Sequence, residues 1–236
     1  MRVAIMQPYL FPYLGYFQLM DAVDCFVFFD DAQYMKGGWI NRNRILLGGA
    51  PRWWTYPVIR EDYTLPIRQR RYDRSLETDV SFIGKIEAAY RGAPGRDQGV
   101  ALVRSCFDNP ENIVSRFNAR QLVEVASLLG IDCDFLVSSE LEYDRSLSGQ
   151  DRVIELCTRL GASHYVNSMG GVALYQRSRF EQAGIELCFL RPRLPAYAQF
   201  GAPHVPLLSV VDVLMFNSLQ ASRAMLAERE LEGASA

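Results

Sequence analysis

Lysine and histidine are scarce in this sequence of 236 residues. Lys36 and Lys85 are the only lysines and there are 2 histidines, so arginine carries nearly all of the positive charge. Lysine plus arginine total 25 against 27 for aspartate plus glutamate, a net charge of -2. Because no excess of positive charge draws such a chain to phosphate backbones, nucleic acid is not an expected partner.

Paired cysteines and long apolar runs are also missing. The cysteines are Cys25, Cys106, Cys133, Cys157 and Cys188, with no CxxC pair among them. An odd, dispersed set predicts neither a disulfide framework nor a zinc site. No uncharged apolar run approaches the roughly 18 residues that cross a bilayer, and Pro8 and Pro12 interrupt the opening segment, which lacks the features of a signal peptide. We expect no membrane insertion and a cytoplasmic location.

Three common catalytic motifs are absent as well. The chain contains no GxSxG, no P-loop and no GxGxxG, which disfavours a serine hydrolase, a standard nucleotide kinase and an ordinary dinucleotide dehydrogenase. With 49% hydrophobic and 22% charged residues, the chain nevertheless has enough apolar material for a large core. The sequence therefore predicts a folded protein without one of these signatures.

The order of the expected elements predicts an α/β fold. Residues 2–6 form a β-rich run, residues 13–23 carry apolar groups at helical spacing, and residues 25–29 (CFVFF) are typical of a strand buried on both faces. A β-α-β start predicts a parallel sheet with a right-handed crossover. We expect a Rossmann-like, mostly parallel sheet with flanking helices, in a single domain over residues 1–236 with a helical insertion at about residues 75–130.

Further elements follow from apolar periodicity and from turn residues. We expect strands at 41–47 and 53–59, separated by a turn at 48–51, and later strands at 134–137, 164–167 and 185–190. Helices are expected at 75–90, 99–107, 111–129, 148–160 and 172–183, with one or two closing helices in 209–226. The tail, residues 228–236, is expected to fray.

Polar groups follow several of the expected strands, where parallel sheets collect ligands. Gln7 follows the first strand, Asp30, Asp31 and Gln33 follow the second, and Asn167, Gly170 and Gly171 lie between a later strand and its helix. The glycines permit close backbone approach, or they simply form a turn. The adjacent carboxylates face opposite ways in extended backbone, so one is a candidate base while the other caps a turn; alternatively, both only end the strand.

The segment KGGWINRNRI concentrates cations beside amides. In strand geometry Arg42 and Arg44 point to one face, and Asn41 and Asn43 to the other. Two guanidinium groups near Lys36 suit a pyrophosphate or a carboxylate, while the alternative is a solvated edge strand. Lys36 is also a candidate catalytic amine if its surroundings lower its pKa.

Several blocks of the sequence resemble the WbqC-like protein family. They include AIMQPYLFPYLGYFQLM, FVFFDDAQYMKGGWINRNRI and SGQDRVIELCTRLGASHYVNSMGGVALY, and the similarity extends to LSVVDVLMFN. Many members begin with His-Gln-Pro, where this chain has Met6-Gln7-Pro8. The resemblance implies a role in O-antigen or other surface-polysaccharide synthesis, with transfer of an aminoacyl group such as glycyl to an amino sugar suggested. Carried over by position, its motif residues are Gln7, Pro8, Tyr13, Gly15, Tyr16, Asp30, Asp31, Gln33, Lys36, Gly38, Trp39, Asn41, Arg42, Asn43, Arg44, Gln150, Asn167, Gly170, Gly171, Asp212 and Asn217.

The start of the chain alone also looks like that of nucleotidylyl transferases, whose HxGH signature holds phosphates at a helix N-terminus. Tyr13 and Tyr16 stand where that signature has its histidines. Tyrosine donates a hydrogen bond but supplies no cation at neutral pH. The resemblance implies an enzyme that activates a carboxylate with ATP, although this chain lacks both histidines.

Our first hypothesis is a transferase that acts on a nucleotide-linked amino sugar. Arg42, Arg44 and Lys36 would neutralise pyrophosphate or an activated carboxylate, and Asp30 or Asp31 would accept the proton of the attacking amine. In this scheme Asp30, Asp31 and Lys36 are catalytic, while Gln7, Tyr13, Tyr16, Gln33, Asn41, Arg42, Asn43, Arg44, Asn167, Gly170 and Gly171 bind substrate. The alternatives are a non-catalytic nucleotide-sugar binding or scaffold protein and the ATP-dependent enzyme above. The sequence identifies no cofactor and no oligomeric state.

Overall fold

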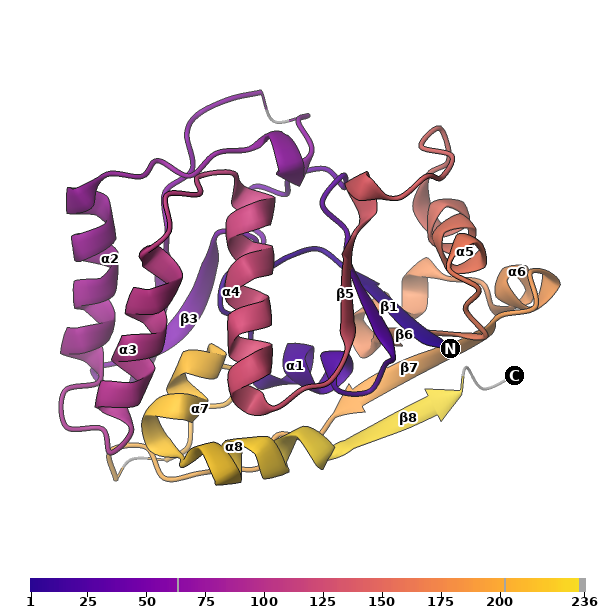
Figure 1. Cartoon of the computed structure of the whole chain (residues 1–236). Coiled ribbons are helices and arrows are strands. Elements are labelled where there is room, and N and C mark those ends of the chain that lie inside the picture. The colour runs from indigo at the N-terminus through magenta and orange to yellow at the C-terminus, as the bar shows by residue number, and fades with distance from the viewer. Residues whose placement is uncertain (63, 202, 234–236) are drawn as a thin grey trace.

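A six-stranded sheet forms the centre of the computed structural model, which describes residues 1–62, 64–201 and 203–233 (Figure 1). In spatial order its strands are β5 (Asp134–Val137), β2 (Cys25–Phe28), β1 (Arg2–Met6), β6 (His164–Ser168), β7 (Glu186–Pro192) and β8 (Arg229–Gly233). The first five are parallel and β8 is antiparallel to β7. The predicted α/β class, with a mostly parallel sheet and flanking helices, is confirmed.

Alternating side chains give the sheet two buried faces. Ala4 and Phe26 pack on the face covered by α1 (Leu14–Met20) and α4 (Val114–Leu129). Val3, Ile5 and Val27 pack on the opposite face. That face is covered by α5 (Gly149–Arg159) and α6 (Arg177–Gln182). Each central strand is therefore apolar on both sides, as the run CFVFF predicts.

The helices predicted between residues 75 and 129 are α2 (Leu76–Ala89), α3 (Arg96–Phe107) and α4, which stand side by side in Figure 1. Ser75 caps α2 by accepting a hydrogen bond from the backbone N–H of Thr78. Gly130 ends α4 with a φ of 75°, the left-handed conformation that glycine tolerates best. That these helices form an insertion into a single domain stays a prediction.

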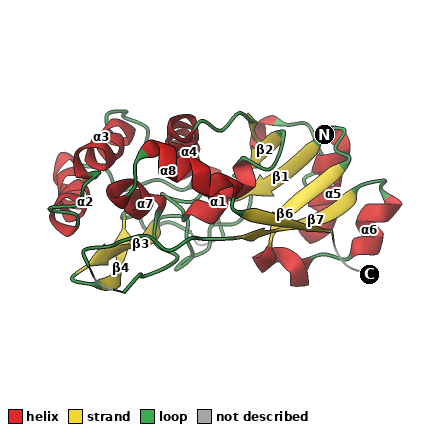
Figure 2. Cartoon of the chain, turned by 90° about the horizontal axis from the view of Figure 1, so that it is seen from below, coloured by secondary structure: helices red, strands yellow, loops and turns green. Residues whose placement is uncertain are grey.

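A separate hairpin lies beside these helices, apart from the main sheet (Figure 2). Its strands are β3 (Arg42–Leu47) and β4 (Ala50–Thr55), so the predicted second strand at 53–59 is placed several residues too late. The turn is Gly48-Gly49 alone, with φ values of 63° and 73°. Positive φ at both central residues matches the turn to the twist of the strands, and this permits pairing from Ala50 onward.

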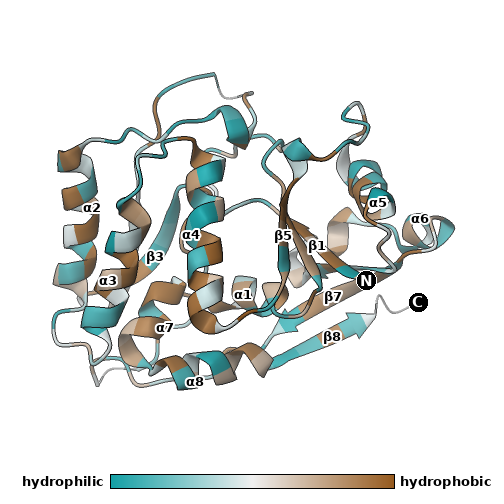
Figure 3. Ribbon diagram, viewed as in Figure 1, coloured by the Kyte–Doolittle hydropathy of each residue, from teal (hydrophilic) through white to brown (hydrophobic). Residues whose placement is uncertain are grey.

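Two later segments also differ from expectation. The predicted helix at 172–183 is a 3-10 segment, η3 (Met169–Leu174), followed by the shorter α6. After α7 (Val210–Phe216) and α8 (Leu219–Ala224), the tail predicted to fray forms β8, although residues 234–236 lie outside the described part. Glu232 of β8 pairs with Arg191 of β7 at 2.5 Å. Figure 3 shows this edge strand as hydrophilic, which suits an exposed edge.

In residues 1–62, 64–201 and 203–233 no helix has both the length and the apolar composition to cross a bilayer.

Candidate functional site

The strand order reverses between β1 and β6. From β1 the chain proceeds outward to β2 and β5 on one side, whereas β6 and β7 lie on the other. Such a reversal opens a crevice at the carboxyl ends of the two strands, where ligands bind in open α/β sheets. Here a cavity of about 260 Å³ is lined by Met6 and Ser168, the last residues of β1 and β6. We call it the switch-point cavity.

Sequence-predicted residues meet at this cavity. Tyr13 and Tyr16 reach it from the start of α1, and Asn43 and Arg44 reach it from β3. The start of α1 and the hairpin therefore meet around one hollow at the end of the sheet.

Arg44 gives the cavity wall a positive charge. Its Nη2 donates to the Leu207 carbonyl oxygen at 3.1 Å, while its Nε is buried and makes no hydrogen bond among the described residues. Within the same residues no carboxylate lies at ion-pair distance from Arg44. A guanidinium group without a counter-charge in a partly enclosed cavity favours an anionic ligand.

The segment around Leu207 closes one side of the cavity. Leu207 has a φ of 58°, a conformation that side chains other than glycine rarely adopt. The backbone N–H of Ser209 donates to the Arg44 carbonyl oxygen at 2.8 Å, and the Ser209 hydroxyl donates to the Phe11 carbonyl oxygen at 2.8 Å. These bonds hold the segment against β3 and against the loop after β1.

Hydrogen bonds to Asp212, which is fully buried, also fix the segment around Leu207. The Asp212 carboxylate accepts from the Tyr90 hydroxyl at 2.8 Å, the Tyr197 hydroxyl at 2.6 Å and the Gln199 amide at 2.7 Å. Burial raises the pKa of Asp212 above its usual value, and these hydrogen bonds oppose the rise. Asp212 thereby joins α2, α7 and the loop before Leu207.

Aromatic rings form another part of the cavity wall. Tyr9 and Trp39 line the cavity with Tyr13 and Tyr16, and Tyr16 donates to the Gln7 carbonyl oxygen at 2.8 Å. Burial raises the pKa of the phenols Tyr9, Tyr13 and Tyr16. These hydroxyls therefore stay protonated at neutral pH, where they serve as hydrogen-bond donors and not as bases.

Two tryptophans and two arginines contact one another in the order Arg42, Trp53, Trp39, Arg44 beside the hairpin. The Arg42 guanidinium lies 4.0 Å from the Trp53 ring centroid, Trp53 lies 5.2 Å from Trp39, and the Arg44 guanidinium lies 5.7 Å from Trp39. Both guanidinium groups point to one face, as strand alternation predicts, while Asn43 is buried. These contacts hold Trp39 at the rim of the switch-point cavity.

The glycine turn after β6 supports the cavity from outside. Asn167 donates to the Tyr165 hydroxyl at 2.9 Å and accepts from the backbone N–H of Ser168 at 2.6 Å. A Cβ at Gly171 would lie 2.8 Å from the Asn167 amide nitrogen, and one at Gly170 would lie 3.8 Å from the Ser168 hydroxyl. Gly171 therefore leaves room for the Asn167 amide, and Asn167 positions Ser168, which itself lines the cavity.

The acidic pair lies at the end of β2, beside β5. Asp30 accepts from the Ser139 N–H at 3.0 Å and from the Ser139 hydroxyl at 2.8 Å. Asp31 accepts from the Ser138 hydroxyl at 2.7 Å and from the Tyr143 hydroxyl, and it lies 3.5 Å from Arg145. Neither residue lines the switch-point cavity. Their predicted catalytic role stays a prediction.

Lys36 and Arg42 line a different cavity, of about 370 Å³, together with Asn41. Asn41 is buried and accepts from the Tyr34 hydroxyl at 2.9 Å, while its amide donates to the Tyr56 carbonyl oxygen at 2.8 Å. Gln33 is exposed and its backbone pairs with Pro66. The predicted binding set is therefore divided between neighbouring hollows.

Several residues that line the cavity are not among the predicted site residues. Trp39 enters only through the family resemblance, Ser168 lies within the segment from Asn167 to Gly171 without being selected, and Leu207 does not enter at all. Ser168 lies inside the glycine segment, so its place directly after a strand is a usable signal. Nothing in the local sequence marks Leu207, because its place depends on contacts with β3.

A profile of the WbqC-like protein family matches residues 7–224 of the chain. The chain belongs to the WbqC-like protein family. It is also 27% identical over 225 residues to "Uncharacterized protein Rv1507c" of Mycobacterium tuberculosis, an alignment that covers 92% of this chain and 93% of the relative. No solved structure matches the chain. The match to the WbqC-like family includes the residues of the switch-point cavity from Tyr9 to Leu207.

Proposed function

We propose that this WbqC-like protein is a group-transfer enzyme of surface-polysaccharide synthesis that binds a nucleotide-linked amino sugar in the switch-point cavity. The observation that supports it is the Arg44 guanidinium, placed without a counter-charge among aromatic rings at the reversal of the strand order. The transferred group is an acyl or aminoacyl group, and the acceptor is the sugar nitrogen. The expected cytoplasmic location is part of this proposal.

The chemistry of the cavity suits the two parts of such a ligand. Pyrophosphate would supply the negative counter-charge for Arg44. A guanidinium group binds phosphate oxygens in a bidentate manner. The faces of Trp39 and Tyr13 offer stacking surfaces for a sugar or a base. At about 260 Å³ the cavity holds one part of the ligand, and the remainder extends past its rim.

A second candidate function is non-catalytic binding of the same ligand. The residues that line the switch-point cavity in the described part of the chain include no carboxylate, histidine or cysteine. The three phenols there stay protonated at neutral pH, so the cavity wall itself supplies donors but no base. This composition favours recognition and leaves a base to be supplied from elsewhere.

Replacing Arg44 with glutamine is expected to weaken binding of a UDP-linked amino sugar by about 10- to 100-fold, because a charge-assisted hydrogen bond to phosphate is lost. Isothermal titration calorimetry measures this change. Arg52→Gln is the matched control, since Arg52 lies exposed on the same hairpin and does not line the cavity. Equal affinities for the two variants would place the ligand elsewhere.

Turnover distinguishes the two candidate functions. The protein is incubated with a UDP-linked amino sugar, glycine and ATP, and the products are analysed by mass spectrometry. A new adduct that disappears in Arg44→Gln supports the transferase. Tight binding without any adduct supports the binding protein.

Replacing Gly15 with alanine is expected to reduce ligand affinity about tenfold while the stability changes by less than about 1 kcal/mol. The added Cβ would lie 2.4 Å from Cε2 of the Tyr13 ring, so this flexible side chain must leave its place on the cavity wall. Calorimetry gives the affinity and urea unfolding gives the stability. Gly84→Ala is the control, because its added Cβ meets nothing within 4 Å and Gly84 does not line the cavity. If Gly15→Ala binds the ligand as tightly as the wild type, Tyr13 is not part of the binding site.

A further inference from the structure

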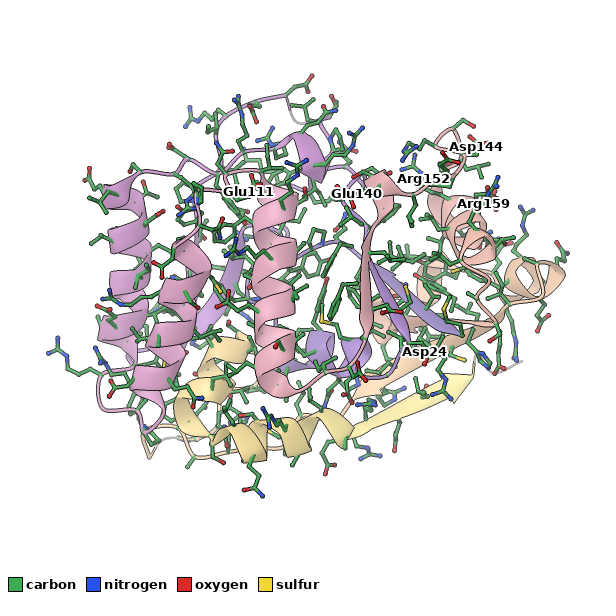
Figure 4. The ribbon with its side chains drawn as sticks, viewed as in Figure 1. Asp24, Glu111, Glu140, Asp144, Arg152 and Arg159 are labelled. Atoms are coloured by element: carbon green, nitrogen blue, oxygen red, sulfur yellow. The ribbon has the colours of Figure 1, made fainter. Side chains whose placement is uncertain are left out.

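A second cavity lies farther along the carboxyl edge of the sheet. It has a volume of about 400 Å³ and is lined by residues from the ends of β2 and β5 and from the first turn of α4. We call it the α4 cavity. It shares no lining residue with the switch-point cavity. Figure 4 shows Glu140, one of its lining residues, beside the end of β5 at the edge where α4 begins.

The first turn of α4 lies at this cavity. The helix has 16 residues, and the residue before it, Ile113, supplies no side-chain cap. The Val114 N–H donates to the Arg70 carbonyl oxygen at 2.9 Å, and the Phe117 N–H donates to the Ile113 carbonyl oxygen at 2.9 Å. Within the described part of the chain this leaves the amides of Ser115 and Arg116, which helix geometry does not pair. Both residues line the cavity.

Ser115 supplies a second, independent feature. Its side chain is buried, with 2% exposure, and its hydroxyl makes no hydrogen bond among the described residues. A buried hydroxyl without a partner costs free energy unless something satisfies it. A ligand in the cavity that Ser115 lines would provide that partner.

Charge is distributed unevenly around the α4 cavity. Arg68 and Arg116 line it and are exposed; Arg116 lies 4.0 Å from Glu111, and Arg68 forms no ion pair within the described residues. On the β5 side, Asp30 is held by Ser139, and Glu140 is exposed at the rim. The cationic side therefore suits an oxyanion, and the acidic side suits a neutral or cationic group.

We propose that the α4 cavity is a second ligand site, which takes the phosphate or carboxylate group of a small molecule. The oxyanion accepts hydrogen bonds from the Ser115 and Arg116 amides and from the Ser115 hydroxyl, with the Arg68 and Arg116 guanidinium groups as counter-charges. The remainder of the molecule, facing Asp30 and Glu140, is neutral or cationic. This site does not depend on the proposed function of the switch-point cavity.

Titration of the isotope-labelled protein with inorganic phosphate, and separately with acetate, tests this site by NMR at constant pH and ionic strength. We expect the largest shifts at the amides of Ser115 and Arg116. Ser115→Ala and Arg116→Gln should each weaken binding by about tenfold, since each removes a donor to a charged group. Saturation with only one of the two anions identifies the chemical class of the ligand.

Matched controls lie on the same helix. Ser127→Ala and Arg120→Gln change exposed residues of α4 that do not line the cavity, and both should bind like the wild type. The proposal is overturned if neither anion, at concentrations up to about 50 mM, shifts the NMR resonances of the Ser115 and Arg116 amides. A dissociation constant above about 50 mM would be too weak for a ligand site. Equal weakening in the control variants, which would reflect diffuse attraction, also overturns it.

Discussion

Replacing Asp30 with alanine is expected to lower the free energy of unfolding by about 3 to 4 kcal/mol. Asp30 is 3% exposed and accepts from the N–H and the hydroxyl of Ser139. It also accepts from the Ser138 hydroxyl at 3.0 Å. Without the carboxylate, the Ser139 N–H and hydroxyl at the end of β5 lose their partner, whereas the Ser138 hydroxyl keeps Asp31 as its acceptor. Urea unfolding followed by circular dichroism measures the loss.

Asp151→Ala is the control for this variant. Asp151 lies on α5 with a side chain that is 45% exposed, and its pairing with Arg179 at 2.8 Å is a surface ion pair. Such pairs contribute between 0 and about 1 kcal/mol, so this variant should unfold almost like the wild type. Similar stability losses in the two variants would contradict the role of Asp30 as the link between β2 and β5.

The same variant also tests the catalytic role predicted for Asp30. Under conditions where Asp30→Ala remains folded, a structural carboxylate leaves the turnover of each folded molecule close to that of the wild type. A general base contributes about 10²- to 10⁴-fold to the rate, and its removal abolishes that contribution. Turnover normalised to the folded fraction separates the two roles.

The fold was largely predictable because its signals are local. The run CFVF of β2 is buried throughout, as a continuous apolar strand requires, and Phe29 after it is half-buried. Alternation along β3 correctly directs Arg42 and Arg44 to one side and buries Asn43. The exact hairpin turn was missed because four residues, Gly48 to Pro51, all have turn character, and only pairing across the strands selects the first two.

The grouping of the site residues depends on strand order, which the local sequence does not contain. β2 and β6 lie on opposite sides of β1. Asp30 and Asp31 therefore end next to β5, whereas Asn167 and Ser168 end at the reversal beside β1. All four lie at carboxyl ends of strands of one sheet, where the sequence places Asp30, Asp31 and Asn167. Which ends adjoin is decided by packing of the helices over the whole sheet.

Replacing Gly95 with alanine is expected to destabilise the protein by about 3 kcal/mol, since two segments of backbone must separate. A Cβ at this position would lie 2.2 Å from the Leu214 carbonyl oxygen and 3.1 Å from that of Met215. The Gly95 N–H also donates to the Met215 carbonyl oxygen at 2.8 Å. Backbone yields less readily than the end of a side chain, so α3 and α7 must move apart.

Gly84→Ala is the matched control for this close approach. Gly84 lies inside α2, and a Cβ there would meet nothing within 4 Å. Because alanine favours a helix interior over glycine by about 1 kcal/mol, this variant should be more stable than the wild type. In both thermal and urea unfolding, the midpoint should fall for Gly95→Ala and rise for Gly84→Ala.

The effect of Gly95→Ala should extend to the switch-point cavity. α7 carries Asp212 and begins directly after Ser209, which binds the backbone of Arg44 and of Phe11. A displaced α7 therefore loosens the segment that holds Arg44, and ligand affinity should fall in the variant molecules that remain folded. Gly84→Ala should leave the affinity unchanged. If Gly95→Ala destabilises the fold but binds ligand like the wild type, α7 does not position the cavity.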